Sequence, residues 1–180
     1  MATQLRIEAL HERHRALPPP VAAYYEQAAS VCLSRHHAPP VQVTLNDNGT
    51  ETLAEVTWTA PDARTLDAWA NARVATEHGA YGCVIAGVEE LRGLVAVRRA
   101  DTPTGADYYV GPPGTGQHDL EDCLRLEVSG VDAGDNREVS RRLLRKAQQA
   151  REGSSSLPAL AGVMGFSARL LMLRDVAEVP

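Results

Sequence analysis

Two short runs that are typical of β-strands, separated by a loop rich in glycine and proline, constrain this sequence more than any other feature. The first run is Gly105–Gly111 and the second is Cys123–Gly130. In the second run, apolar residues alternate with polar ones at the period of two that a strand requires. Prolines and glycines between the runs favour a turn. The sequence therefore predicts two adjacent antiparallel strands of one sheet.

Each of these runs carries one carboxylate. Asp107 opens the first run, and Glu127 lies inside the second. On neighbouring strands the two side chains can come close together, and carboxylates that close repel each other unless a cation neutralises them. Hard divalent ions such as Mg²⁺ prefer carboxylate oxygens as ligands. The pair Asp107 and Glu127 therefore predicts a magnesium site.

Length, charge and cysteine usage limit the class of protein. A chain of 180 residues is most simply a single domain, residues 1–180. The net charge of −5 argues against a surface coated all over with nucleic acid, although it leaves room for a local basic groove. No apolar run is long enough to span a bilayer, and the polar first residues do not resemble a signal peptide. Cys32, Cys83 and Cys123 are widely spaced, which predicts reduced thiols in a cytoplasmic protein with no membrane association.

The first sixty residues are expected to form an extension made of helices and a hairpin. Apolar spacing predicts helices over residues 3–16 and 21–35. Alternating residues around the tight-turn sequence Asn-Asp-Asn-Gly predict a β-hairpin over residues 41–59. We expect this extension, residues 1–60, to precede a core formed by residues 61–180.

The core is expected to combine helices with further strands. A long helix is predicted over residues 62–91, with Glu77 on or beside its packed face. Because of the glycines in this segment, a strand over residues 83–87 is the alternative. A short strand follows at 94–97, a helix at 137–151 and further strands within 157–173. Together with the two central strands, this order predicts an α/β fold in which a mixed sheet is flanked by helices.

The helix near the C-terminus is locally basic. Arg141, Arg142 and Arg145 lie on it, and so does Lys146, the single lysine of the chain. Such a helix predicts a local contact surface for nucleic acid, despite the acidic net charge. The other interpretation of Lys146 is an ordinary solvated helix face.

The loop Gly111–His118 is similar to the P-loop of AAA-type ATPases. Gln117 stands in place of the lysine that reaches the phosphates, and His118 in place of the hydroxyl residue that binds Mg²⁺. The long helix that should follow such a loop has no room before the next strand. We therefore expect an ordinary hairpin loop without a nucleotide.

The order of the predicted elements resembles the restriction-endonuclease-like fold of the PD-(D/E)xK phosphodiesterase superfamily. In that superfamily a helix often offers an acid, and the next hairpin carries an Asp followed by a Glu-x-Lys motif. The matching pieces here are Gly105-Ala-Asp107 and Leu126-Glu-Val-Ser129, within roughly residues 62–174. Ser129 stands at the family's lysine position, and no proline precedes Asp107. Some members carry the lysine on the following helix, where Lys146 lies.

The resemblance implies a Mg²⁺-dependent nuclease, or a nuclease-like subunit, that acts on nucleic acid in bacterial defence. In this interpretation Asp107 and Glu127 hold the ion and Glu77 completes its ligands. Lys146 stabilises the charge that develops on the phosphate. The alternative is a non-catalytic interaction protein on the same scaffold, bound to a protein partner or to a second copy. Ser129 at the lysine position and the acidic net charge favour this alternative, with Asp107 as a turn residue and Glu127 facing solvent.

Overall fold

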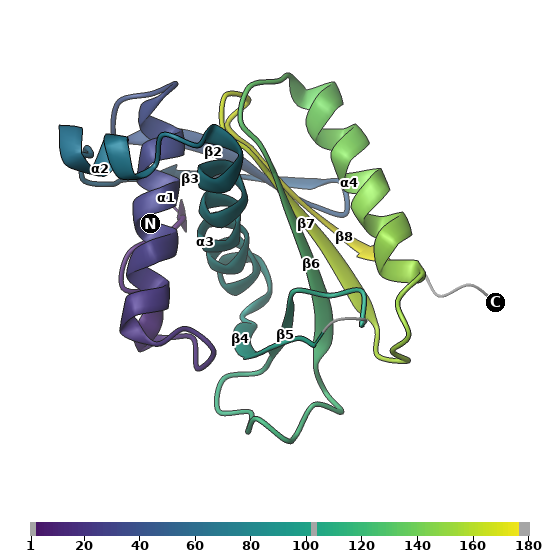
Figure 1. The fold of residues 1–180 in the computed structure, drawn as a ribbon. Coiled ribbons are helices and arrows are strands. Elements are labelled where there is room, and N and C mark those ends of the chain that lie inside the picture. The colour runs from purple at the N-terminus through teal and green to yellow at the C-terminus, as the bar shows by residue number, and fades with distance from the viewer. Residues whose placement is uncertain (1–2, 102–103, 177–180) are drawn as a thin grey trace.

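One eight-stranded mixed sheet runs through the protein, with helices on both of its faces (Figure 1). The structure, a computed structural model, describes residues 3–101 and 104–176. The strands are β1 (Thr3–Gln4), β2 (Val41–Asp47), β3 (Thr50–Val56), β4 (Val95–Arg99), β5 (Tyr108–Gly111), β6 (Leu124–Val131), β7 (Ala159–Gly165) and β8 (Leu170–Val176). The helices are α1 (Pro19–Ser34), α2 (Ala63–Ala68), α3 (Ala72–Arg92) and α4 (Asn136–Arg151), with a 3₁₀ turn η1 (Leu10–Glu12). The predicted α/β class is confirmed.

The strands follow the order β1-β3-β2-β8-β7-β6-β5-β4 across the sheet. β4, β5 and β6 form an antiparallel meander, and α4 then returns the chain so that β7 lies parallel to β6. The predicted pairing of the two central strands is confirmed, because Tyr108 of β5 lies opposite Leu126 of β6 in an antiparallel ladder. The loop between them contains turns and no helix, as expected. The N-terminal hairpin β2–β3 joins the same sheet, since β2 pairs in parallel with β8.

The N-terminal segment departs from the prediction. The helix expected over residues 3–16 is wrong: β1 pairs in parallel with β3, and the segment otherwise holds one short 3₁₀ turn. Leu5 and Ile7 are fully buried although they lie two residues apart. In an extended chain, residues at this spacing point to the same side. An apolar spacing that resembled a helix therefore belongs to an extended edge of the sheet.

The long helix predicted over residues 62–91 is two helices. Each begins at a side-chain cap: Asp62 accepts a hydrogen bond from the N–H of Thr65 at 2.7 Å, and Asn71 accepts one from Val74 at 3.3 Å. A cap of this kind satisfies a backbone donor at a helix N-terminus. The predicted helix is therefore interrupted between α2 and α3.

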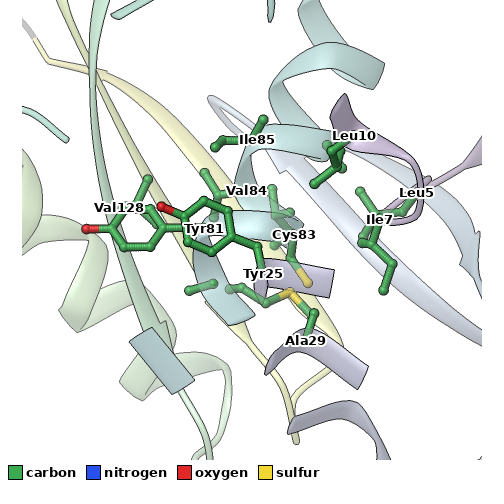
Figure 2. Packing of buried hydrophobic residues seen from close by; sticks show 14 of the residues in the cluster. Leu5, Ile7, Leu10, Tyr25, Ala29, Tyr81, Cys83, Val84, Ile85 and Val128 are labelled. Atoms are coloured by element: carbon green, nitrogen blue, oxygen red, sulfur yellow. The ribbon is translucent and has the colours of Figure 1, made fainter. Parts of the chain in front are cut away.

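Helix α3 covers one face of the sheet, with α1 packed against it, and α4 covers the other face (Figure 1). Glycines in α3 allow α3 and α1 to pack closely, because a Cβ atom at Gly79 would lie 3.1 Å from backbone atoms of Ala28. The largest apolar cluster lies under this pair. Figure 2 shows Tyr25 of α1 and Tyr81 of α3 in this cluster, together with Val128 of β6.

Strand β6 separates the two faces by alternation. Leu126 and Val128 belong to the apolar cluster under α3, whereas the side chains of Arg125, Glu127 and Ser129 contact α4. Alternate residues of a strand point to opposite faces. Glu127 therefore lies beneath the basic helix rather than among the apolar side chains.

Candidate functional site

A cleft of about 950 Å³ opens between α3, β6 and α4. Four predicted site residues line it: Glu77 from α3, Asp107 from the residue before β5, Glu127 from β6 and Lys146 from α4. Arg142, one of the arginines predicted to contact nucleic acid, lines it as well. The fold thus brings together side chains that the sequence distributes over three elements and the residue before β5.

Four residues of helix α4 cover nearly the same distance as two residues of strand β6, which explains why Lys146 contacts Glu127. Four residues of a helix advance about 6 Å, and two residues of a strand advance about 6.6 Å. Contacts between the two elements can therefore repeat at four-residue and two-residue intervals. The observed contacts are Arg142 Nη1 to Ser129 Oγ at 3.3 Å, Lys146 Nζ to Glu127 Oε1 at 2.7 Å, and Arg125 Nη1 to the carbonyl oxygen of Ala150 at 3.1 Å.

Arg125 makes the last of these contacts, near the start of β6 and the end of α4. Its guanidinium is buried and donates to the carbonyl oxygens of Thr104, Ala150 and Leu157 at 2.8 to 3.1 Å. These carbonyls belong to the segment before Asp107, the last turn of α4 and the segment before β7. One buried cation therefore ties together three parts of the chain that border the site.

Glu127 and Lys146 form a mostly buried ion pair. The side chain of Glu127 is 6% exposed and that of Lys146 is 22% exposed. Burial raises the pKa of the Glu127 carboxyl, and the nearby charge of Asp107 raises it further, while Lys146 opposes both. The alternative in which Glu127 faces solvent is wrong.

Asp107 lies against β6 on both sides of Glu127. Its backbone N–H donates to the carbonyl oxygen of Leu126 at 2.8 Å, and its Oδ2 accepts from the N–H of Val128 at 2.8 Å. Its Oδ1 accepts from the hydroxyl of Tyr81 at 2.6 Å. One hydrogen bond to each carboxylate oxygen holds the group where β5 begins beside β6.

The three arginines of α4 that were predicted to contact nucleic acid divide into two groups. Arg141 pairs with Glu138 at 2.7 Å, and Arg145 lies 3.5 Å from the same carboxylate; neither arginine lines the cleft. Arg142 does line it, and its Nε is buried without a hydrogen-bond partner among the described residues. The basic surface predicted for nucleic acid is thus reduced, at the cleft, to Arg142 and Lys146 on this helix.

The predicted three-carboxylate metal site is not assembled. Within residues 3–101 and 104–176, no group of three or more His, Cys, Asp or Glu side chains stands close enough to hold a metal ion. Glu77 is exposed on α3 and borders the cleft. Two carboxylates, Asp107 and Glu127, remain as the candidate ligands.

Tyr81 and Arg99 are site residues that the sequence reasoning missed. Tyr81 bonds directly to Asp107, and Arg99 Nη2 lies 3.3 Å from the Tyr81 hydroxyl and 3.8 Å from Asp107. A signal existed for Tyr81, because it follows Glu77 by four residues and so shares its helix face. The position of Arg99 depends on the sheet and had no such local signal.

Other predictions concern compartment and membranes. All three cysteines are buried free thiols. Among the helices of the described residues, none has the length and apolar character needed to cross a membrane.

No protein-family model, curated protein or solved structure matches this chain. A functional interpretation must therefore come from the residues of the cleft and their contacts.

Proposed function

We propose that the protein is a Mg²⁺-dependent phosphodiesterase that cleaves nucleic acid in the cleft between α3, β6 and α4. The observation that carries this proposal is the contact of Lys146 with Glu127 at 2.7 Å, beside Asp107 in one cleft. The order of elements that surrounds these residues also supports the resemblance to the PD-(D/E)xK superfamily.

Cationic side chains from α4 compensate for the missing lysine at Ser129. The family motif places its lysine at this position of the strand, two residues after the glutamate. Here Arg142 Nη1 donates to the hydroxyl of Ser129, and Lys146 reaches Glu127 from the same helix. The strand therefore lacks the lysine, while α4 brings two cationic groups to the same place.

The donor set suits Mg²⁺. An ionised carboxylate has about four acceptor positions on its two oxygens. Asp107 uses one position on each oxygen, for Tyr81 and Val128, so further lone pairs are available to a ligand. Proteins commonly bind Mg²⁺ through one or two carboxylates together with substrate phosphates and water. Asp107 and Glu127 would hold the ion, and Glu77 would face it from across the cleft.

The remaining chemistry comes from side chains of this chain. When bound, a divalent ion polarises a phosphate and lowers the pKa of a coordinated water. The Lys146 ammonium lies at Glu127 and can stabilise negative charge that develops on the phosphate. The guanidinium of Arg142 lines the same cleft and supplies a second cation that suits a phosphate oxygen.

A cation would also help a polyanion to enter the cleft. Five acidic residues line it, Glu77, Asp107, Glu127, Asp132 and Glu138, against three basic ones, Arg73, Arg142 and Lys146. Asp132 and Glu138 are already paired with Arg35 and Arg141, which do not line the cleft, so the remaining charges are balanced, three of each sign. A divalent ion at Asp107 and Glu127 would add the positive charge that attracts a polyanion.

The second candidate is a non-catalytic interaction protein. It is favoured by the fact that both central carboxylates already have partners, Lys146 for Glu127 and Tyr81 with Val128 for Asp107. Without a metal ion, the cleft has no excess of positive charge that would attract nucleic acid, which favours a protein partner.

The test is cleavage of labelled single-stranded and double-stranded DNA and RNA with Mg²⁺ or Mn²⁺, and with EDTA. Wild-type protein should cleave in the presence of metal, and Asp107→Asn or Lys146→Met should lose at least about 100-fold in rate. The matched control is Glu121→Gln, which neutralises an exposed acid that does not line the cleft and should keep full activity.

Absence of both cleavage and Mn²⁺ binding by calorimetry would refute the nuclease proposal and favour the interaction protein. Cleavage that persists in Asp107→Asn would place the activity elsewhere, for example in a contaminant.

A further inference from the structure

Behind Asp107 lies a network of three tyrosines around one arginine. The guanidinium of Arg99 lies 4.8 Å from the ring centres of Tyr81 and Tyr108. Its Nη1 donates to the hydroxyl of Tyr25 at 3.2 Å, and its Nη2 donates to the hydroxyl of Tyr81 at 3.3 Å. The hydroxyls of Tyr25 and Tyr108 are bonded to each other at 2.7 Å. Of the three tyrosines, Tyr81 is the one that also contacts Asp107.

The direction of the hydrogen bonds in this network is fixed by chemistry. A guanidinium has donors and no acceptor, so the Tyr81 oxygen must accept from Arg99. Asp107, when ionised, can only accept, so the Tyr81 proton must point to Asp107 Oδ1.

The carboxylate of Asp107 is therefore held at both oxygens. Val128 N–H, which belongs to the backbone of β6, holds Oδ2, and Tyr81 on α3 holds Oδ1. Loss of the Tyr81 hydroxyl would leave one oxygen without its donor and allow the group to rotate. The Val128 contact cannot be removed by a side-chain substitution, so Tyr81 is the one of these two donors that a substitution can remove.

We infer that Tyr81 is a positioning residue that orients the Asp107 carboxylate for a divalent cation in the cleft, with Arg99 fixing the direction of its proton. This inference rests on the proposed function. Supporting groups of this kind orient metal ligands, and their loss typically weakens metal affinity 10-fold to 100-fold.

The experiment measures Mn²⁺ affinity by electron paramagnetic resonance of the bound ion, together with the melting temperature. The variants are Tyr81→Phe and, as matched control, Tyr108→Phe, which removes a buried hydroxyl from the same network without touching Asp107. Tyr81→Phe should weaken Mn²⁺ binding at least about 10-fold and change the spectrum of the bound ion. Tyr108→Phe should leave both within about twofold of wild type.

The outcomes separate the inference from the proposed function. If wild-type protein binds Mn²⁺ and Tyr81→Phe binds it equally well, the inference is overturned while the proposed function stands. If both variants weaken binding to the same degree, the effect is a general one of the network and the role assigned to Tyr81 is overturned. If wild-type protein binds no Mn²⁺, both the proposed function and the inference fail.

Discussion

Replacement of Lys146 by methionine tests the central ion pair without any assumption about the reaction. The change keeps most of the apolar stem and removes the ammonium that lies 2.7 Å from Glu127. Glu127 is then left 6% exposed, with the charge of Asp107 nearby. Removal of one partner of a buried pair costs about 3–5 kcal/mol, and we take the lower end, about 3 kcal/mol at pH 8, because Lys146 is partly exposed.

The pH dependence of this loss has a defined sign. The pKa of Glu127 lies above its ordinary value of 4.5 in the folded protein, and loss of Lys146 raises it further because the lysine lowers it. For a group whose folded pKa is raised, stability is complete below the ordinary pKa and falls as pH rises through the folded value. Lys146→Met should therefore be less destabilised at pH 5 than at pH 8.

The assay is urea unfolding followed by far-UV circular dichroism at both pH values. The matched control is Arg141→Met on the same helix, since Arg141 also pairs at 2.7 Å but is 66% exposed, with its partner Glu138 at 31%. This exposed pair should contribute less than about 1 kcal/mol. The double variant Lys146→Met with Glu127→Gln should recover much of the loss, because no buried charge remains. An equal cost for Lys146→Met and Arg141→Met, or no difference between pH 5 and pH 8, would refute the reasoning.

Three further substitutions test the scaffold by the same unfolding assay. Arg125→Met should destabilise by about 3 kcal/mol, because the carbonyl oxygens of Thr104, Ala150 and Leu157 lose the hydrogen bonds from a buried charged group. A cost below about 1 kcal/mol would contradict the role of Arg125 in tying these segments together. Gly162→Ala should cost about 1–3 kcal/mol, since the added Cβ would overlap the side chain of Val84, and unchanged stability would show that α3 can shift away. Arg92 lowers the pKa of Asp175, so their ion pair stabilises the folded protein above pH 3.8, and this stabilisation is lost as Asp175 becomes protonated in acid. The stability of Arg92→Met should therefore fall less steeply than that of wild type between pH 5 and pH 3.

The sequence was most informative where the pattern was local. The period of two in β6 placed Glu127 on the opposite face from Leu126 and Val128, and the glycine-proline loop predicted the antiparallel pairing with β5. The basic helix was placed correctly beside them. That Lys146 reaches Glu127 follows from the register between a helix and a strand, which the spacing along the chain alone does not determine.

Two of the failures share a physical cause, because they depend on contacts between distant parts of the chain. Leu5 and Ile7 follow β1, which pairs with β3, and no short-range pattern predicts that pairing. The contact of Tyr81 with Asp107 depends on the position along β6 at which α3 packs, and the local sequence does not determine that position. The cap at Asn71, in contrast, is a local signal that could have divided the long helix in advance.

The parallel pairing of β2 with β8 has a consequence for how the chain reaches its native state. Thr44 lies beside Leu170, so the β2–β3 hairpin cannot complete its pairing until a strand 126 residues further along the chain is available (170 − 44 = 126). Closing so long a loop is slow, and until then one edge of β2 is open to pairing with other chains. We expect β8 to dock in the last folding step, so that in pulse-labelled hydrogen exchange the amides of β8 become protected after those of the β4–β6 meander. Earlier protection of β8 would show that the sheet instead grows from its β2 side.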